Sequence, residues 1–355
     1  MAEQTIVTLF LAISILLLPS IGRCEKEVSF SITPVLDQQY YKTLKGLLQQ
    51  ADKQIGLVQL SLFSENGSSR SITNALCRAA KRGVQVDVLL EGHKGKIADR
   101  NRLTAQRLKR AGARVSFSSH NKIVHTKLVL IDDDLSLFGS TNLSSNSMNN
   151  NHESNVLIRS RRASSMLWRY LRKLRKDPRI DVNMVELLED STTSVFTDRG
   201  FVSRAIKVIN GAKKLLRVSS YFFARRNGPK GRDTTKLYSA LANAAKRGVR
   251  VELYLEKSGF APHLNEFAAQ SVQWLLSQAK MYVRFDEPEK ISHCKLIIAD
   301  PEDDEECQLI LGSSNWSRGD VEINHQVNCH ITDPKIVRSF NKYFEAIYKV
   351  ANPHS

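Results

Sequence analysis

The chain has 355 residues, of which 42% are hydrophobic and 25% are charged. This composition is ordinary for a globular protein with room for two domains, and it excludes a disordered protein, a fibre and a membrane protein with many spans. The formal net charge of +16 is typical of proteins with a polyanionic partner, such as nucleic acid, an anionic membrane surface or a phosphorylated substrate. Charge alone leaves a uniformly solvated basic surface open as the alternative.

The N-terminus carries an apolar run at residues 6–18. Its length suits the hydrophobic core of a signal peptide and is shorter than the roughly 20 residues of a membrane-spanning helix. Ser20 and Gly22 are the small residues expected at positions −3 and −1 of a cleavage site before Arg23. We therefore predict a signal peptide at 1–22 and export to a periplasm, the extracellular space or an endomembrane lumen. An uncleaved N-terminal anchor is the alternative, because no Lys or Arg precedes the run.

An internal repeat organises the rest of the chain. Residues 79–91 return as residues 244–256, with the stretch AAKRGV in common. Each copy is typical of a helix that ends at a glycine and is followed by a strand. An apolar strand is expected upstream of each copy, at 55–63 and 215–223. The pattern predicts an α/β fold of two pseudo-symmetric, βαβ-rich halves, and such a duplication often builds an active site at the interface of the halves.

Composition also suggests the boundaries of these halves. The first is expected at 23–180 and the second at 201–355. A linker is expected at 181–200, because Pro178 precedes it and a polar run at 190–194 lies within it. Since both halves belong to one chain, we expect a monomer with an internal pseudo-dimer. The sequence itself indicates no protein partner.

The residues with chemical potential occur twice, in register with the repeat. The first half carries, in order, His125-Thr126-Lys127, Asp132, Gly139-Ser140-Thr141-Asn142 and Asn151-His152-Glu153. The second half carries His293-Cys294-Lys295, Asp300, Gly312-Ser313-Ser314-Asn315 and Asn324-His325-Gln326. Both series read H-x-K-x4-D, then G-S-x-N, then a polar triplet. One copy would be a weak pattern, but two copies aligned with a duplication indicate a function.

Strand geometry shows what these residues can do together. Each H-x-K copy lies in an apolar, β-branched stretch typical of a strand, at 124–131 and 291–299. Residues two apart on a strand point to the same side, so the histidine and lysine of each copy share a face. The serine and asparagine of each G-S-x-N share a face in the same way: Ser140 with Asn142, and Ser313 with Asn315. Brought together, the two sets match a phosphodiester.

The chemistry follows from these side chains. Lysines neutralise the non-bridging oxygens of a phosphodiester, while Ser and Asn hold them. One imidazole can attack phosphorus and the other can protonate the leaving oxygen. We expect no metal and no cofactor, because lysines supply the charge and stand where a metal site would need carboxylates. The five cysteines show no zinc-binding spacing.

The duplicated H-x-K-x4-D resembles the signature of the phospholipase D superfamily, and the resemblance covers essentially the whole chain after residue 22. It implies that His125 forms a phosphohistidine intermediate and that His293 is the general acid, which then deprotonates water or an alcohol. It also implies that Asp132 and Asp300 orient the histidines or brace the site. The residues themselves leave a structural role open, because Asp132 begins a stretch of three aspartates that is typical of a turn.

The second polar triplet departs from the family pattern. Members of the family usually carry Glu in the last position, as at Glu153, where it can orient a catalytic histidine. The second copy has Gln326, whose neutral amide supports an imidazolium less well. If Glu153 serves the nucleophile, the weaker support falls on the acid. Glu322 is a candidate to substitute for the missing carboxylate.

Three functions fit the sequence. The first is an exported phospholipase D-like enzyme that hydrolyses or exchanges phospholipid head groups, and its Asn-His-Glu triplet resembles that of cardiolipin synthases. The second is a secreted nuclease, favoured by the charge and by the run at 312–317, which resembles the second motif of endolysosomal exonuclease relatives. The third is an inactive module that binds anionic lipid or nucleic acid, supported by Gln326 alone. We favour phospholipid by a small margin. Trp316 is expected to stack on a base, insert into lipid or lie in the core.

Overall fold

The computed structural model describes residues 29–93, 95–118, 122–225, 232–257, 259, 261–287 and 290–353. The signal peptide expected at 1–22 lies outside these residues and stays a prediction. Within the described part of the chain, every helix is too short or too polar to cross a membrane.

The first half is built on a sheet of seven strands. Its elements are β1 (Ser31–Leu36), α1 (Gln39–Gln50), β2 (Gln54–Gln59), α2 (Gly67–Lys81), β3 (Gln85–Leu90), α3 (Lys96–Arg110), β4 (Arg114–Phe117), β5 (Lys127–Ile131), β6 (Leu135–Gly139), α4 (Ser145–Asn149), β7 (Ser154–Arg159) and α5 (Arg161–Lys176). The strand order is β1-β7-β6-β5-β2-β3-β4. Strands β2, β3 and β4 are parallel, as two βαβ units require, and the others pair antiparallel.

The second half repeats this topology in a sheet of nine strands. Its elements are β8 (Val185–Leu187), β9 (Thr193–Thr197), α6 (Phe201–Gly211), β10 (Leu215–Ser220), α7 (Arg232–Lys246), β11 (Arg250–Leu255), α8 (Pro262–Gln278), β12 (Tyr282–Phe285), β13 (Leu296–Ala299), β14 (Gln308–Gly312), β15 (Val327–Ile331), α9 (Pro334–Val350) and β16 (Asn352–Pro353). The order is β16-β12-β11-β10-β13-β14-β15-β9-β8. The prediction of two pseudo-symmetric α/β halves is confirmed.

The segment expected as a linker contributes two strands to the second sheet. Strand β9 pairs with β15 as β1 pairs with β7, so β9 is the pseudo-symmetric partner of β1. Its Thr and Val side chains are β-branched and buried in the sheet, which explains why a run rich in Ser and Thr forms a strand here. Residues 181–200 therefore join the halves in sequence while belonging to the second sheet.

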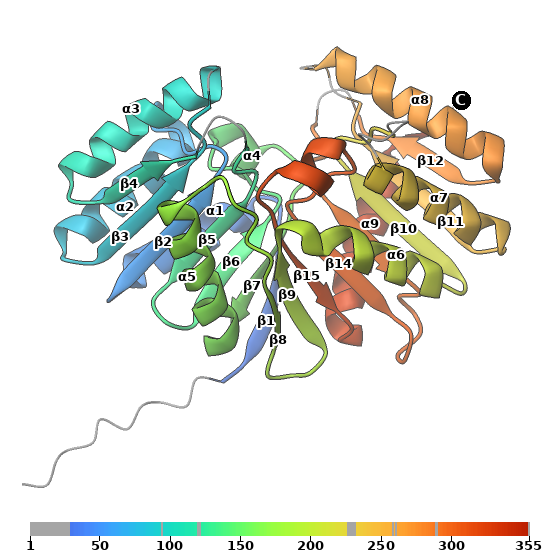
Figure 1. Ribbon diagram of the computed structural model, residues 1–355, viewed down its shortest axis with the longest axis horizontal. Helices are drawn as coiled ribbons and strands as arrows, with labels where there is room; N and C mark the ends of the chain where they lie inside the picture. The colour runs from blue at the N-terminus through green and yellow to red at the C-terminus, as the bar shows by residue number, and fades with distance from the viewer. Residues whose placement is uncertain are drawn as a thin grey trace, which may run out of the picture.

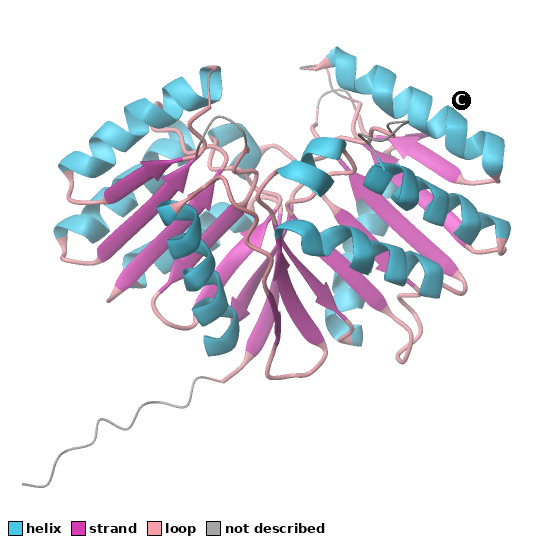
Figure 2. Ribbon diagram, in the orientation of Figure 1, coloured by secondary structure: helices cyan, strands magenta, loops and turns pink. Residues whose placement is uncertain are grey.

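The two sheets meet in the middle of the molecule and share a core. Strands β6 and β7 contact β14 and β15, and apolar side chains of both inner faces form one continuous cluster with α5 and α9. Figures 1 and 2 show the sheets spreading from this centre, with the remaining helices on the outer faces, where they cover two separate apolar clusters. Helix α5 also reaches β8, and α9 reaches β1, so each half packs a helix on the other.

Candidate active site

Backbone hydrogen bonds bring the two H-x-K motifs to the interface between the halves. The amide of His125 donates to the carbonyl of His325 at 3.1 Å, and the amide of His325 donates to Ile123 at 2.9 Å. On the other side, the amide of His293 donates to His152 at 2.9 Å. Each polar triplet thus pairs with the segment that carries the histidine of the opposite half. Both motif histidines are positioned by this exchange.

His293 is held by the carboxylate of the first half. Its Nδ1 lies 3.0 Å from Oε2 of Glu153, which is fully buried. Ser140 donates to the same oxygen of Glu153 at 2.5 Å, and Asn151 donates to its other oxygen at 3.2 Å. The possibility that Glu153 serves the nucleophile of its own half is therefore wrong: the crossed pairing of the halves gives it to the histidine of the second half.

His125 has a different environment. Its Nδ1 lies 3.3 Å from the side-chain amide of Gln326 and 3.3 Å from Oδ1 of Asp320. Asp320 belongs to a short π-helical turn, Gly319–Ile323, and lies outside the motifs found in the sequence. Glu322, the expected substitute for the missing carboxylate, accepts a hydrogen bond from Arg318 at 3.1 Å instead.

The motif lysines are buried beside the histidines. The side chains of Lys127 and Lys295 donate to the carbonyls of His125 and His293, each at 2.5 Å. The two lysine residues are only 1% and 4% exposed. Burial lowers the pKa of Lys295 to about 8. Burial, reinforced by the charge of Lys295, lowers the pKa of Lys127 well below its usual value. A bound anion would offset the desolvation that both ammonium groups suffer.

The pKa values of the two histidines are lowered by burial and are modified by different neighbours. Burial lowers the pKa of His125 to about 3, and the charges of Lys127 and Lys295 add to this against the opposing effect of Asp320. His125 is therefore neutral at pH 7. Burial also lowers the pKa of His293, but the hydrogen-bonded Glu153 opposes the shift. Burial alone would raise the pKa of Glu153, yet the charge and hydrogen bond of His293 outweigh it and keep the pKa low.

The serines and asparagines of G-S-x-N act mainly on neighbouring side chains. Ser313 donates to the amide oxygen of Gln326 at 2.5 Å, as Ser140 donates to Glu153. Asn315 donates from Nδ2 to Asp320 at 2.6 Å and accepts at Oδ1 from the amide of Phe222 at 3.2 Å. Of the residues expected to hold phosphate or orient histidines, Glu153 and Gln326 contact the histidines. Both serines contact these two side chains, and Asn315 contacts Asp320. Asn142 keeps a buried Oδ1 without a hydrogen-bond partner in the described part of the chain.

The glycine that opens G-S-x-N is required by close packing. A Cβ on Gly139 would lie 2.4 Å from the carbonyl oxygen of Ser154, and one on Gly312 would lie 2.4 Å from that of Val327. Any side chain here would push β6 from β7 or β14 from β15. Glycine at this position therefore lets the two strands pack closely enough for the following serine to contact the polar triplet.

Asp132 and Asp300 are not brought to the histidines. Seven residues of largely extended chain, each about 3.3 Å, place Asp132 on the order of 20 Å from His125, at the far end of β5. There each aspartate has a positive φ, 49° and 44°, which Asp tolerates better than most residues. Their carboxylates accept hydrogen bonds from three successive backbone amides, at Asp52, Lys53 and Gln54 for the first and at Lys213, Lys214 and Leu215 for the second. Their catalytic assignment is replaced by a structural one.

Asp132→Ala is accordingly expected to lower the free energy of unfolding by roughly 2 to 3 kcal/mol, because it removes a charged acceptor of backbone amides and leaves alanine at a positive φ. The rate constant for turnover should stay within about twofold of wild type. Urea unfolding and steady-state kinetics on the same preparation check both. A large drop in kcat with unchanged stability would return Asp132 to the chemistry.

Each triplet is also fixed by an Asp-His-Tyr cluster that sequence reasoning missed. Asp37 accepts from the amide of Glu153 at 2.8 Å and from the hydroxyl of Tyr343 at 2.5 Å, and lies 3.3 Å from the ring of His152. The second cluster repeats the arrangement with Asp198, His325 and Tyr170 around Gln326. Each tyrosine comes from the half opposite its aspartate, which no local pattern reveals.

Two further glutamates hold the chain just before the motif histidines. Glu91 accepts from the amide of Val124 at 2.8 Å, and Glu256 accepts from that of Ser292 at 2.6 Å. Both glutamates end a copy of the AAKRGV repeat, so the repeat was the signal that could have found them. On the second side, the ring of Tyr221 meets that of His293 edge-on at 4.9 Å, and this contact has no sequence signal.

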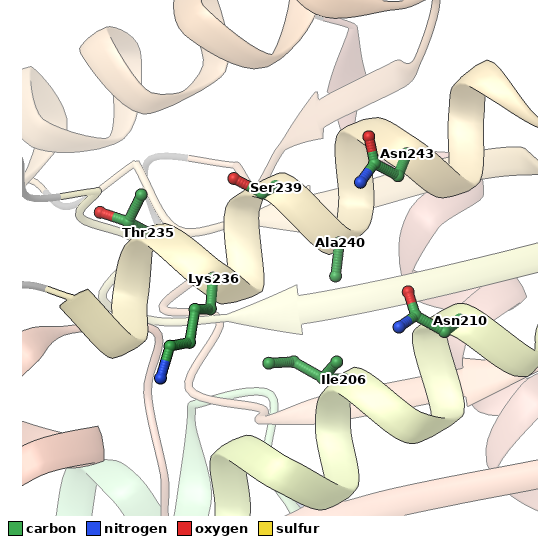
Figure 3. Close-up of a pocket in the computed structure, with 7 residues that line it drawn as sticks. All are labelled: Ile206, Asn210, Thr235, Lys236, Ser239, Ala240 and Asn243. Atoms are coloured by element: carbon green, nitrogen blue, oxygen red, sulfur yellow. The ribbon is translucent and has the colours of Figure 1, made fainter.

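Two hollows differ in their relation to these residues. A groove of 460 Å³ between α6 and α7, drawn in Figure 3, contains none of the motif residues. A pocket of 230 Å³ lies next to Asn315 and Asp320 along the chain, and is lined by Phe222, Ala224, Ser317, Arg318, Gly319 and Ile323. Among the described residues, no three His, Cys, Asp or Glu side chains gather in a way that could hold a metal ion.

Comparison with known proteins gives one family match and several relatives. The family model described as the PLD-like domain of cardiolipin synthase matches residues 44–175 and 205–348. Cardiolipin synthase A of Buchnera aphidicola subsp. Acyrthosiphon pisum (strain APS) is 32% identical over 92 residues, which are 25% of this chain and 19% of that protein. The protein of the same name from subsp. Schizaphis graminum (strain Sg) is 32% identical over 101 residues, 28% and 21% of the two chains. The match thus spans a small part of these curated relatives.

Solved structures show similarity of fold. The phosphatidylserine synthase of Haemophilus influenzae Rd KW20 superposes with a TM-score of 0.69 at 12% identity, covering 92% of this chain and 90% of that one. The polyphosphate kinase of Porphyromonas gingivalis gives a TM-score of 0.60 at 17% identity, covering 89% and 50%. At these identities the likeness concerns the fold alone.

Proposed function

Since the chain belongs to the phospholipase D superfamily, through the PLD-like domain of cardiolipin synthase, we propose that it is a metal-independent phosphodiesterase that works through a phosphohistidine on His125. Its proposed substrates are phospholipids, whose head groups it hydrolyses or exchanges. The observation that carries the proposal is the pairing of His293 with the buried Glu153 at 3.0 Å, opposite a neutral His125 in the same interface.

We infer different roles for the two histidines from the contacts that their rings make. Nδ1 of each ring faces a side chain of the protein, so Nε2 is the nitrogen left for substrate. Nε2 of neutral His125 attacks phosphorus while the bond to the leaving oxygen breaks, and that oxygen takes the proton from Nε2 of His293. His293 then removes a proton from water or an alcohol, whose oxygen attacks phosphorus as the N–P bond breaks. Glu153 stabilises the imidazolium of His293 in both steps.

Lys127 and Lys295 supply the positive charge that the pentavalent transition state needs. We therefore expect turnover to persist in EDTA. We also expect a falling limb in the pH profile, because the burial that lowers the pKa of Lys295 to about 8 leaves it uncharged above that pH. For a diester with a nitrophenolate leaving group, which needs no proton, kcat/KM should fall as the pH rises through about 8 or below.

The test is a pH profile of kcat/KM for this activated diester between pH 5 and about 10, the upper end lying near the usual pKa of lysine. With an alkyl leaving group the fall should begin at lower pH, since His293 must then be protonated and its pKa is lowered by burial. A rate for the activated diester that stays flat to pH 10 would show that neither lysine has the lowered pKa.

Three features of the site and its surroundings support phospholipid over nucleic acid. Ile123, which is 39% exposed, stands two residues before His125 and so offers an apolar contact beside the reacting groups. The pocket beside Asn315 is lined by Phe222 and Ile323, which suits an apolar group better than a base with polar edges. Trp316, a candidate stacking platform for a base, is 1% exposed and packs on Phe223 and Tyr238 in the core.

A nuclease acting by the same chemistry is the second candidate, and the net charge of +16 favours it. A paired assay in EDTA separates the two: vesicles of mixed anionic and zwitterionic phospholipids in one reaction, single-stranded DNA and RNA in the other. Release of head groups without release of nucleotides is the expected result. Nucleotide release alone would make the enzyme a nuclease. No activity in either assay would favour an inactive module that binds anionic lipid or nucleic acid.

We also propose that the chain is exported, on the strength of the apolar run at 6–18. The mature protein should then begin at Arg23. Retention in the membrane with the N-terminus intact would indicate an anchor.

A further inference from the structure

The carboxylate missing from position 326 is present elsewhere in the site. We propose that Asp320 is the positioning residue of His125, as Glu153 is for His293. This proposal rests on the function proposed above only in taking His125 as the nucleophile. In the first half the carboxylate lies in the polar triplet, whereas in the second half it lies in the turn after G-S-x-N. Gln326 then carries a neutral amide without any loss of charge at the site.

The pseudo-symmetry of the halves identifies the counterpart of Asp320. Ser147 follows Asn142 at the same spacing as Asp320 follows Asn315. Both make the same local contact: the amide of Asn142 donates to Oγ of Ser147 at 3.0 Å, and the amide of Asn315 donates to Oδ2 of Asp320 at 3.1 Å. The two residues therefore occupy equivalent places, one on α4 and one on the π-helical turn, a conformation that is frequent at functional sites.

Ser147 and Asp320 also make equivalent contacts with the last residue of the polar triplet, but the carboxylate lies on opposite members of the two pairs. In the first half, the hydroxyl of Ser147 donates to the carboxylate of Glu153. In the second half the direction is reversed, and Nε2 of Gln326 donates to Oδ1 of Asp320 at 2.7 Å. The pair Ser147 and Glu153 has thus become Asp320 and Gln326, with one carboxylate in each.

In both halves the asparagine of the polar triplet donates a hydrogen bond to the carboxylate. Asn151 donates from Nδ2 to Glu153 at 3.2 Å. Its counterpart Asn324 does not bind Gln326 but donates to Oδ1 of Asp320 at 2.8 Å. Amide or hydroxyl donors therefore surround both carboxylates, Glu153 in the first half and Asp320 in the second, although the two differ in their place along the chain.

The position of Asp320 fits this role. Its Oδ1 lies 3.3 Å from Nδ1 of His125, where Glu153 lies 3.0 Å from Nδ1 of His293. Asp320 is 3% exposed. Burial alone would raise its pKa, but His125 and the hydrogen bonds from Asn324 and Asn315 outweigh burial and lower it. A charged acceptor beside Nδ1 favours the tautomer that is protonated there, which leaves the lone pair of Nε2 free for attack.

The test compares wild type with D320S and with D320S/Q326E. The single variant removes the carboxylate, and the double variant rebuilds the first-half arrangement of a serine with a glutamate. The first readout needs no substrate: 15N shifts of the imidazole of His125 report its tautomer. We expect the Nδ1–H form in wild type, a mixture in D320S and the Nδ1–H form again in D320S/Q326E.

The second readout is the rate of attack on an activated diester. D320S should lower it by about 10²- to 10⁴-fold, the range known for removal of a carboxylate behind a catalytic histidine. D320S/Q326E should recover to within about tenfold of wild type. Glu322→Gln is the matched control, because it removes a negative charge from the same turn at a residue that accepts a hydrogen bond from Arg318, and it should change neither readout.

The outcomes are distinguishable. If D320S keeps the wild-type tautomer, or if a folded D320S/Q326E is as impaired as D320S, then Asp320 only braces Asn315 and Asn324 and the proposal fails. If wild type cleaves no phosphodiester at all, the proposed function fails, and the tautomer series still decides whether Asp320 positions His125.

Discussion

Replacing His125 with asparagine is expected to reduce kcat for any phosphodiester substrate by at least about 10⁴-fold, the loss that removal of a covalent nucleophile produces in other enzymes. The variant should remain folded, because the backbone bond from residue 125 to the carbonyl of His325 needs no imidazole. Asparagine also places an amide close to where Gln326 meets Nδ1.

Steady-state kinetics and thermal unfolding on the same preparation check this prediction. A midpoint of unfolding close to that of wild type separates loss of the nucleophile from loss of the fold. Activity within about tenfold of wild type would mean that another group attacks phosphorus, and the assignment of roles would have to be reversed or abandoned.

Replacing His293 with asparagine is expected to split the reaction according to the leaving group. An alkyl leaving group needs the proton of His293, so turnover should fall by about 10³- to 10⁴-fold. A nitrophenolate needs no proton, so it should still leave in a single burst. The phosphorylated His125 should then accumulate, because the base that activates water is missing and hydrolysis of the N–P bond is slow.

A rapid-quench measurement of nitrophenolate release follows this burst. Its amplitude should approach one equivalent per enzyme, followed by a slow steady state. Glu153→Gln is a graded control, since it leaves the imidazole and removes the carboxylate 3.0 Å from its Nδ1. Full steady-state turnover of the activated diester by His293→Asn would show that His293 is not the base of the second step.

Much of the fold, and the meeting of the two H-x-K motifs between the halves, could be predicted from the sequence, because the patterns behind them are local and occur twice. The periodic helix and strand in each AAKRGV copy predict the βαβ units. The strands expected to carry each H-x-K begin later than predicted, at Lys127 and at Leu296, so both motif histidines precede them. The G-S-x-N motif could be located in the same way. Its glycine has a reason that only the structure gives, the 2.4 Å approach of a carbonyl to any Cβ at Gly139.

The identity of each histidine's partner could not be predicted, because it depends on how the halves dock. The β-bridges from Val124 to His325 and from His152 to Ser292 cross the interface. They place Glu153 beside a histidine of the opposite half. No spacing within one half contains this information. The stretch of three aspartates that begins at Asp132 leaves a structural role open, and the positive φ of 49° at Asp132 agrees with the turn expected there.

The remaining gaps have equally physical causes. Asp320 was missed because a carboxylate in a short turn has no periodic signature, and only the comparison with Ser147 in three dimensions reveals its place. The strands β8 and β9 were expected as linker because Ser and Thr are common in loops as well as at sheet edges. Their pairing partner, β15, lies far along the chain.

The central claim is that two half-sites from one chain form a single centre in which His125 carries the covalent intermediate. The most direct measurement is peptide mapping of the wild-type enzyme quenched at alkaline pH during turnover of an activated diester, with EDTA present. The account predicts a phosphoryl adduct on the peptide that contains His125 and none on the peptide that contains His293. An adduct on His293, or steady turnover with no adduct on either histidine, would contradict it.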